Sequence, residues 1–326
     1  MRAVVVARPG PPDGLEIQDV PVEHPGGSEI LVAVKAAALN RADLLQRRGL
    51  YAPPAGYDAA RLGLEYAGEV VACGAHCALR QVGDRVMGLV PNGAQADFVT
   101  VQERETIIVP PGVPWEVAGA FPEAFLTAYR ALVMIGGCKP DDSCLVRGAT
   151  TAVGQAVVQQ ARLLGASCVL ATGRSMERLE RVVGTTPEER FAEGSGELAR
   201  WVKSRSPTGV QVAVDLVGGE KLGEHLACLA EEGSWVVVGL LGGMQSVFDL
   251  GTMLMRRLSI RAMTMRSLPL EHRIGLSQTA GAQAAAALAS GRLQVTVDQA
   301  LPLTQVRLAH ERMEAGHHFG KLVLLP

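Results

Sequence analysis

The strongest constraint on the fold is the regular alternation of short apolar runs and amphipathic segments between about Asp141 and Ala262. The runs "SCLV", "SCVLAT", "VQVAVDLVGG", "SWVVVGLLGG" and "LSIRAMTM" predict five strands. Between them, "AVGQAVVQQARLLG" has apolar residues at helical spacing and ends at Gly165, and "SMERLERVVG" predicts a second helix. Continuous apolar strands joined by helices indicate a doubly wound parallel sheet that is covered on both faces.

The turn after the first of these strands, "RGATTAVGQA", has the position at which a dinucleotide-binding sheet meets the pyrophosphate. Two glycines of the usual pattern are present, but threonine and alanine stand where a third glycine is common. Alanine adds one methyl group, which the turn accepts if φ stays negative, and the threonine hydroxyls and the helix N-terminus can donate to phosphate oxygens. The predicted contacts are Gly148, Thr150, Thr151, Ala152, Val153 and Gly154. The alternative is a tight turn without a ligand.

The end of the second strand, "LATGRSMER", indicates which dinucleotide binds. An NAD site places an acid there for the ribose hydroxyls, whereas this chain has Gly173 and Arg174, with Arg178 one turn further. A cation at this position suits the 2′-phosphate of NADP and predicts a preference for NADPH of about 10–100-fold. The alternative is that both arginines lie on the solvated start of a helix.

The rest of the chain predicts a second, mostly β domain. Before about Val109, short strand-like runs are separated by turn residues, and "PPGVPW" reads as a boundary before a helical segment that Pro122 interrupts. The final run "GKLVLLP" predicts a strand that rejoins this domain. The expected boundaries are residues 1–118 with 266–326 for the β domain and 119–265 for the parallel sheet.

Composition excludes several classes of function. The net charge of −2 provides no basic field for nucleic acid or an anionic membrane, and the apolar runs are shorter than the roughly 20 residues of a membrane span. The short apolar N-terminal run does not fit a signal peptide, so a cytoplasmic protein is expected. The six cysteines have neither disulfide nor zinc spacing, and no metal is expected.

Several stretches resemble, in order and spacing, the zinc-free quinone oxidoreductase branch of the medium-chain dehydrogenase/reductase superfamily. They are "ALNRADLLQRRGLYAPPAG", "LGLEYAGEV", "VGDRVMGL", "GAQADFVTV", "PEAFLTAYRAL", "DLVGG", "EEGSWVVVGLLGG" and "GKLVLLP". The resemblance implies a Rossmann-type sheet plus a GroES-like catalytic domain, NADPH as cofactor, and hydride transfer to a quinone or a related α,β-unsaturated carbonyl. Zinc-dependent members have a metal-binding cysteine near Asn40 and a histidine at Leu64, so the resemblance also implies that zinc is absent.

The resemblance further assigns individual residues. Asn40 and Tyr51 would line the substrate cleft as hydrogen-bond donors, with Asp43 orienting their loop; a helix cap and a loop aromatic are the alternatives for the first two. The residues that would border the cofactor are Thr127, Gly239, Leu240, Leu241, Phe319, Gly320 and Lys321, although Lys321 could equally be a surface charge. Where relatives have an Asn-Tyr pair for the adenosine, this chain has Arg190-Phe191, which would leave an aromatic surface.

Two other functions and one assembly stay open. An enoyl-thioester reductase shares fold and cofactor, and Arg47 and Arg48 are its weak candidates for binding a carrier phosphate. The altered glycine turn also permits an NADPH-binding structural or redox-sensing protein with little turnover. A homodimer is expected through the last strand of the parallel sheet, residues 258–265.

Overall fold

The computed structural model describes all residues, 1–326, as two compact units. Unit 1 combines Met1–Leu126 with Met265–Pro326, and unit 2 is the contiguous stretch Thr127–Thr264. No helix of either unit has the combination of length and hydrophobicity that crossing a bilayer requires.

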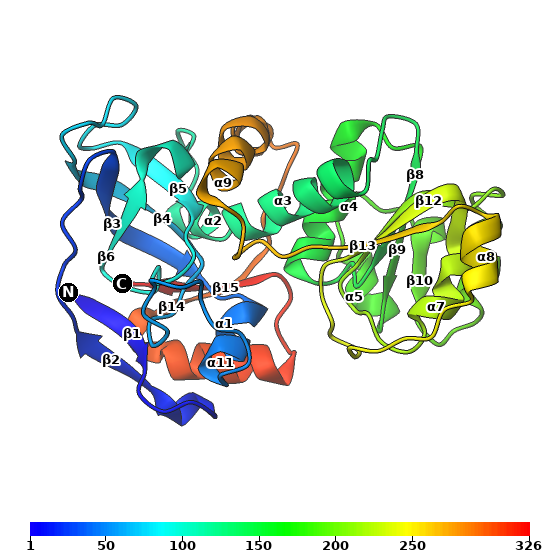
Figure 1. Cartoon of the computed structure of the whole chain (residues 1–326), viewed down its shortest axis with the longest axis horizontal. Coiled ribbons are helices and arrows are strands. Elements are labelled where there is room, and N and C mark those ends of the chain that lie inside the picture. The colour runs from blue at the N-terminus through cyan, green and yellow to red at the C-terminus, as the bar shows by residue number, and fades with distance from the viewer. The chain divides into compact units, whose positions relative to one another are not determined.

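Unit 2 contains the expected doubly wound parallel sheet (Figure 1). Its strands lie in the order β10-β9-β8-β11-β12-β13, and every neighbouring pair is parallel. The strands are β8 (Ser143–Arg147), β9 (Cys168–Gly173), β10 (Arg190–Ala192), β11 (Val210–Asp215), β12 (Leu229–Val237) and β13 (Ser259–Ala262). The chain moves outward from β8 to β10 and then returns to β11 beside β8, which makes the gap between β8 and β11 the place where such sheets bind ligands.

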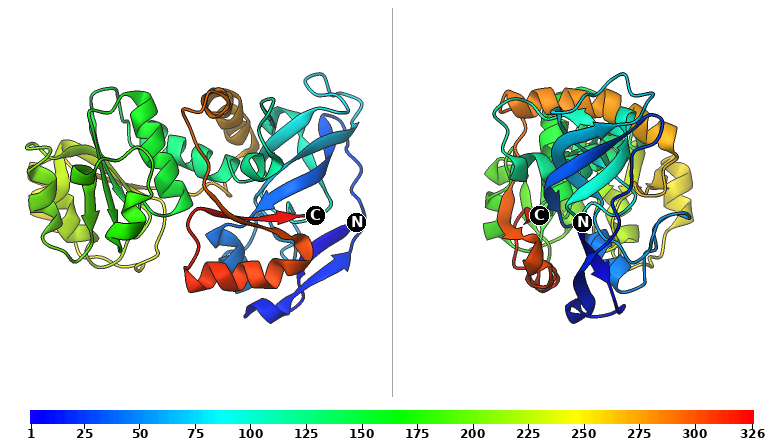
Figure 2. Two further views of the ribbon diagram at one scale, coloured as in Figure 1. Left: turned by 180° about the vertical axis from the view of Figure 1, so that it is seen from behind. Right: turned by 90° about the vertical axis from the view of Figure 1, so that its left-hand side faces the viewer.

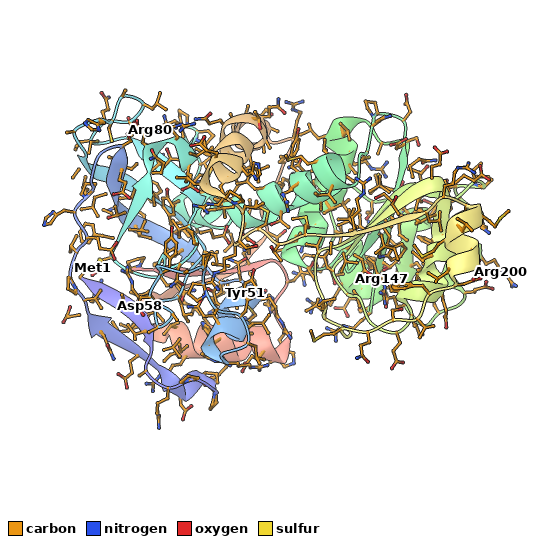
Figure 3. All side chains as sticks on the ribbon, viewed as in Figure 1. Met1, Tyr51, Asp58, Arg80, Arg147 and Arg200 are labelled. Atoms are coloured by element: carbon orange, nitrogen blue, oxygen red, sulfur yellow. The ribbon has the colours of Figure 1, made fainter.

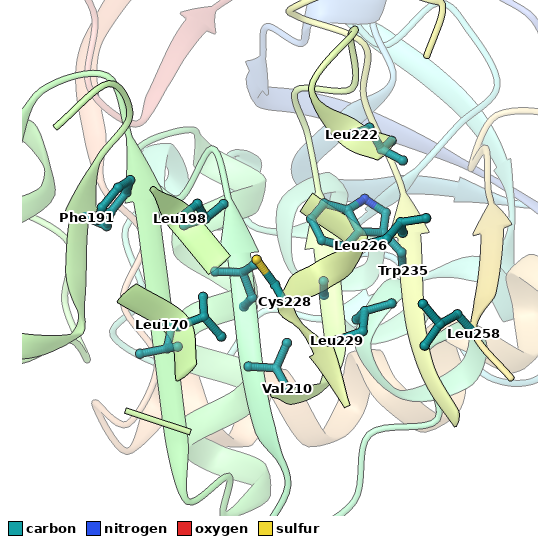
Figure 4. Close-up of a cluster of buried hydrophobic side chains, with 13 residues drawn as sticks. Leu170, Phe191, Leu198, Val210, Leu222, Leu226, Cys228, Leu229, Trp235 and Leu258 are labelled. Atoms are coloured by element: carbon teal, nitrogen blue, oxygen red, sulfur yellow. The ribbon is translucent and has the colours of Figure 1, made fainter. Parts of the chain in front are cut away.

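The helices of unit 2 are α4 (Ala152–Leu164), α5 (Met176–Glu180), α6 (Leu198–Lys203), α7 (Leu222–His225) and α8 (Leu250–Met255). Helix α4 ends at Gly165 with φ of 91°, as its sequence predicts. The helix predicted over "SMERLERVVG" is wrong in length, because it stops after five residues at Glu180. Figure 4 shows a hydrophobic core of unit 2, in which Leu170, Phe191 and Trp235 are buried.

Unit 1 is built on a seven-stranded sheet and a separate hairpin. The main order is β14-β15-β3-β4-β5-β7, with β6 also paired to β3, and β1 pairs with β2. The strands are β1 (Arg2–Val6), β2 (Leu15–Asp19), β3 (Glu29–Ala38), β4 (Glu65–Cys73), β5 (Arg85–Leu89), β6 (Phe98–Gln102), β7 (Ile107–Ile108), β14 (Val297–Pro302) and β15 (Lys321–Leu325). The run "GKLVLLP" therefore returns to this unit as β15, between β14 and β3, as expected.

The helices that begin in unit 1 follow the turn signals of the sequence. They are α1 (Arg41–Arg47), α2 (Trp115–Gly119), α3 (Pro122–Tyr129), α9 (Leu270–Leu276), α10 (Ala282–Ala289) and α11 (Val306–Ala315). Pro122 separates α2 from α3, because proline cannot continue a helix but fits its first turn. Helix α11 packs against α1, as the view from behind in Figure 2 shows. This contact holds α1 and the loop after it against the unit.

Candidate active site

Three adjacent strands of unit 1 bring together Asn40, Glu65 and Lys321. Asn40 follows β3 and caps α1, Glu65 opens β4, and Lys321 opens β15. The Asn40 Nδ2 donates to Glu65 Oε1 at 2.9 Å, and the Lys321 Nζ donates to Asn40 Oδ1 at 2.6 Å and to Glu65 Oε1 at 2.5 Å. The family resemblance named two of these residues, Asn40 and Lys321. The third, Glu65, was not identified from the sequence.

Burial makes these contacts obligatory. The side chain of Glu65 is completely buried and Lys321 is 3% exposed, so Lys321 is not a surface charge. A buried ion pair is stable only when its charges are paired and hydrogen-bonded. The ammonium of Lys321 binds the Asn40 amide oxygen, and Glu65 Oε1, which accepts from the same ammonium, binds the NH₂ group, so the amide is held in one orientation. One N–H binds Glu65, and the other has only a long 3.5 Å approach to the Ala38 carbonyl, which leaves it able to bind a substrate oxygen.

The signal for Glu65 was present in the sequence. "LGLEYAGEV" places Glu65 directly between Leu64 and Tyr66 in an apolar run, and a carboxylate at such a position needs a buried partner. Its second oxygen, Oε2, accepts the backbone N–H of Glu123 in the first turn of α3 at 2.9 Å. The partner Lys321 lies 256 residues further along the chain, and no local pattern connects the two.

Asp43 orients the entrance of α1, as expected. Its carboxylate accepts the backbone N–H of Asn40 at 2.8 Å and that of Gly63 at 3.1 Å. Gly63 has φ of +108°, and a Cβ there would lie 2.3 Å from the backbone nitrogen of Gln95, so glycine is required. Complete burial raises the pKa of Asp43 to about 6, although both hydrogen bonds act in the opposite direction.

Tyr51 lies in the irregular loop that follows α1 (Figure 3). Its side chain is half-buried, and the guanidinium carbon of Arg266 lies 5.3 Å from the centre of its ring. Burial raises the pKa of the phenol. The charge of Arg266 acts to lower this pKa and that of Glu123 to raise it, and both effects are smaller than that of burial. These two charged residues also line a small cavity, whose other lining residues are Leu64, Leu89, Val90, Pro91, Met265 and Arg273.

In unit 2 the altered glycine turn keeps the geometry of a phosphate-binding turn. Gly148 has φ of +83°, and a Cβ on Gly154 would lie 2.4 Å from the Gly148 carbonyl oxygen, so both glycines are required. Ala152 is the first residue of α4 and has negative φ, which explains why alanine is accepted there. Thr151 caps the helix: its hydroxyl accepts the N–H of Gly154 at 3.0 Å and donates to the Gly148 carbonyl at 2.9 Å.

The cap changes which groups of the turn can bind phosphate. Because the Thr151 hydroxyl donates within the turn, its hydrogen is not directed to a ligand. The available donors are the Thr150 hydroxyl and the backbone N–H groups of Ala152 and Val153, which have no acceptor inside the helix. These donors and the dipole of a 13-residue helix fit a pyrophosphate.

The neighbouring strand ends place two further predicted contacts at the same edge of the sheet. Gly173 ends β9, and a Cβ there would lie 3.1 Å from the Thr150 Cγ2 atom. Arg174 follows with an exposed side chain, whereas Arg178 is half-buried in α5, where its backbone N–H approaches the capping hydroxyl of Ser175 at 3.4 Å.

After β12, Gly239 donates its N–H to the Asp215 carbonyl at 3.2 Å. The next two residues, Leu240 and Leu241, are 48% and 47% exposed. Thr127 is buried in α3. Phe319 is buried in unit 1, and its backbone N–H donates to Asp298 Oδ1 at 3.0 Å.

Two expectations about exposed side chains are wrong. Phe191 is packed in the core of unit 2 against Trp201, with ring centres 5.0 Å apart, so it offers no surface to an adenine ring. Arg47 is fully buried; its Nε donates to the Gly10 carbonyl at 2.8 Å, and it pairs with Glu314. Arg47 therefore cannot bind a carrier phosphate at the surface.

Beneath the turns of unit 2 lies a buried ionic network that sequence reasoning did not find. Arg147, at the end of β8 (Figure 3), contacts Asp215 at 3.3 Å, Glu193 at 3.2 Å and the Gly218 carbonyl at 2.6 Å. Asp215 is completely buried and accepts the backbone N–H groups of Val217 at 2.7 Å and Gly218 at 3.0 Å. The network therefore fixes the backbone of the turn after β11.

Comparison with known protein families finds a matching family model for each of two large parts of the chain. The family model of the alcohol dehydrogenase GroES-like domain matches residues 26–136, and a model described as zinc-binding dehydrogenase matches residues 170–324. The chain belongs to the medium-chain dehydrogenase/reductase superfamily. It is thus an oxidoreductase of a superfamily whose members bind a nicotinamide cofactor, with a GroES-like domain and a Rossmann-like sheet.

Similar members of the superfamily differ in function. The human synaptic vesicle membrane protein VAT-1 homolog is 28% identical over 346 residues, which cover 100% of this chain and 86% of that protein. The Escherichia coli quinone oxidoreductase complexed with NADPH is 26% identical, with a TM-score of 0.88 and full coverage of both chains. CurK enoyl reductase is 25% identical, with a TM-score of 0.85 and coverage of 99% of this chain and 98% of that one.

One of the matched superfamily models is described by zinc binding, so the donor set of this chain matters. The chain has Asn40 and Leu64 at the positions where the sequence resemblance places a cysteine and a histidine ligand. No group of three or more His, Cys, Asp or Glu side chains lies close enough together to hold a metal ion. The side chains that meet at Asn40 instead form an ion pair with an amide.

Proposed function

We propose that the chain is an NADPH-dependent, zinc-independent reductase that transfers hydride to quinones or related α,β-unsaturated carbonyls. The observation that carries this proposal is the Asn40 amide, which Glu65 and Lys321 hold in one orientation and whose second N–H has only a 3.5 Å contact with the Ala38 carbonyl. An electron-poor π-system accepts hydride without a Lewis acid if hydrogen-bond donors stabilise the negative charge on its oxygen.

The roles of the residues follow from this arrangement. When bound, the nicotinamide supplies the hydride. Asn40 donates to the oxygen that gains charge. The buried ammonium of Lys321 binds the oxygen of the Asn40 amide and so polarises the amide. Tyr51 donates a hydrogen bond or the proton that completes the reduction.

The cofactor assignment is supported by the turn after β8 and by the end of β9. The two required glycines and the free N–H groups of α4 suit a pyrophosphate, and the exposed Arg174 suits a 2′-phosphate. Absence of NADPH binding in a fluorescence titration would contradict the quinone reductase, the enoyl-thioester reductase and the non-catalytic NADPH-binding protein alike.

The first test is NADPH oxidation by the purified protein with 1,2-naphthoquinone, after subtraction of the direct chemical reaction. The quoted sequence stretches resemble those of the p53-inducible quinone oxidoreductase, which makes this acceptor a reasonable first choice. We expect turnover well above background, and a loss of about 10²–10³-fold in kcat for Asn40→Ala, as for removal of one oxyanion donor. An unchanged rate in this variant would remove Asn40 from the mechanism.

Similarity to an enoyl reductase supports a second candidate, reduction of an enoyl thioester. A kcat/KM for crotonyl-coenzyme A above that for every quinone tested would favour it. Tight NADPH binding without turnover of either acceptor class would instead support a structural or redox-sensing protein.

We also propose a cytoplasmic homodimer. Strand β13 is an open edge of the parallel sheet, and Leu250, Leu254 and Met255 of the preceding helix α8 are 73%, 77% and 74% exposed. Pairing two such edges would cover the apolar side chains. A monomer in sedimentation at micromolar concentration would contradict the dimer.

A further inference from the structure

The loop that carries Tyr51 has no helix or strand of its own, so its position depends on side chains outside it. Gln46, in α1, donates from Nε2 to the carbonyls of Ala59 and Arg61, each at 2.8 Å. The Asn92 Nδ2 donates to the Asp58 carbonyl at 2.5 Å. These contacts fix the end of the loop that leads to β4, but they do not reach Tyr51.

Arg266 provides the contacts to Tyr51. Its Nη1 donates to the Tyr51 carbonyl at 3.1 Å, and its guanidinium lies over the Tyr51 ring. Its Nη2 donates to Asn92 Oδ1 at 3.1 Å and to Gln46 Oε1, and its Nε donates to the Pro91 carbonyl at 2.7 Å. One cation therefore holds Tyr51 at its backbone and its ring, and also binds the two side chains that anchor the rest of the loop.

The environment of Arg266 is unusual for a buried cation. The residue is 6% exposed, and no carboxylate lies within salt-bridge distance. All of its hydrogen-bond acceptors are neutral oxygens. Burial of a charge without an ionic partner is costly, so a role limited to stability is a poor explanation. Arg266 also lines a small cavity together with Glu123.

We propose that Arg266 is a positioning residue that holds the Tyr51 side chain in place through its ring and its backbone carbonyl. The proposal rests on the proposed function, because it gives Arg266 its effect through the Tyr51 hydroxyl. Arg266 acts on the reaction through Tyr51 and not by its own contact with the reacting atoms.

Hydrogen exchange of the backbone amides of Tyr51, Ala52, Ala55, Gly56 and Tyr57 tests the positioning directly, whatever the activity of the protein. We expect Arg266→Gln to raise their exchange rates about tenfold or more, because the loop loses its central donor. Arg266→Lys keeps the cation over the ring and should give a smaller increase. Arg85→Gln is the matched control: Arg85 lies 4.1 Å over the ring of Trp115 in the same unit and should leave this loop unchanged. Unchanged exchange in Arg266→Gln would overturn the proposal.

A double-mutant cycle with Tyr51→Phe distinguishes positioning from general destabilisation. In the wild-type background, Arg266→Gln should lower kcat about 10–100-fold, and Arg266→Lys should restore part of the loss. In the Tyr51→Phe background the same change should cost no more than about twofold, because the group it positions is gone. Additive losses would refute positioning while leaving the proposed function intact. A wild-type protein that reduces neither quinones nor enones would refute the proposed function, while the exchange experiment still decides whether Arg266 orders the loop.

Discussion

Each unit of the molecule has a buried ionic network at its candidate site, Lys321–Glu65 in unit 1 and Arg147–Asp215 in unit 2, and the two networks hold different kinds of group. In unit 1, Lys321 and Glu65 end on a side chain, the amide of Asn40. In unit 2, Arg147 and Asp215 end on backbone groups, the Gly218 carbonyl and the N–H of Val217. The first network specifies the chemistry of one donor, whereas the second fixes the shape of a turn. We therefore expect substitutions in the first network to reduce turnover. Substitutions in the second network should reduce the free energy of unfolding and the affinity for the cofactor.

Arg147→Met is the largest perturbation of this comparison. It leaves the fully buried Asp215 without its cation, and breaking a buried pair in this way costs about 3–5 kcal/mol. Urea denaturation followed by tryptophan fluorescence should show the loss, since two of the three tryptophans, Trp201 and Trp235, lie in unit 2. Arg162→Met is the matched control, since its ion pair with Glu189 is partly exposed and should cost about 1 kcal/mol or less. Equal losses in both variants would contradict the role given to the buried network.

The pH dependence of stability isolates Asp43, which accepts the backbone N–H of Asn40 next to the ionic network of unit 1. Its pKa is raised from 3.8 to about 6, so the folded state binds the proton more tightly than the unfolded state. The stability from this proton is present below pH 4 and is lost as the pH rises to about 6, a change of about 3 kcal/mol. The unfolding free energy of the wild type minus that of Asp43→Asn should fall by this amount between pH 4 and 7. A flat difference would show that Asp43 has an ordinary pKa.

Lys321→Met leaves the buried Glu65 without its cation, so it should also destabilise unit 1, and the kinetics of the protein that remains folded should separate the two networks. Without the ammonium, the orientation of the Asn40 amide is no longer fixed, and we expect kcat to fall about 10²-fold, as for loss of one oxyanion donor. The Kd of NADPH, measured by fluorescence titration, should stay within about threefold, because this network does not support the nucleotide turn. A large change in Kd with constant kcat would reverse the assignment of the two networks.

Arg174→Ala should have the smallest effect, confined to cofactor choice. We expect the ratio of NADPH to NADH affinity to fall about 10–100-fold through loss of one charge-assisted contact. Arg200→Ala is the control, since Arg200 is an exposed arginine of the same unit that lies on α6 and pairs only with Glu197. If the ratio stays constant, Arg174 does not bind the 2′-phosphate.

The contrast between the networks also explains what the sequence could predict. The parallel sheet, the helix that ends at Gly165 and the returning strand β15 follow from local periodicity, and the structure confirms all three. Glu65, Arg147 and Arg266 were not identified, because their partners lie on other elements and only the tertiary fold brings them together. Phe191 was misjudged for the same reason, since its burial depends on packing against Trp201.

The return of β15 to unit 1 also determines when the candidate active site can form during synthesis. Unit 2 is contiguous, so it can fold on the ribosome as soon as it emerges. Unit 1 cannot, because the strand between β14 and β3 and the cation that orients Asn40 are both translated after unit 2. A nascent chain arrested between the two has a nucleotide-binding unit but lacks the ammonium group. The contact between Lys321 and Asn40 therefore forms only after Lys321 has been translated.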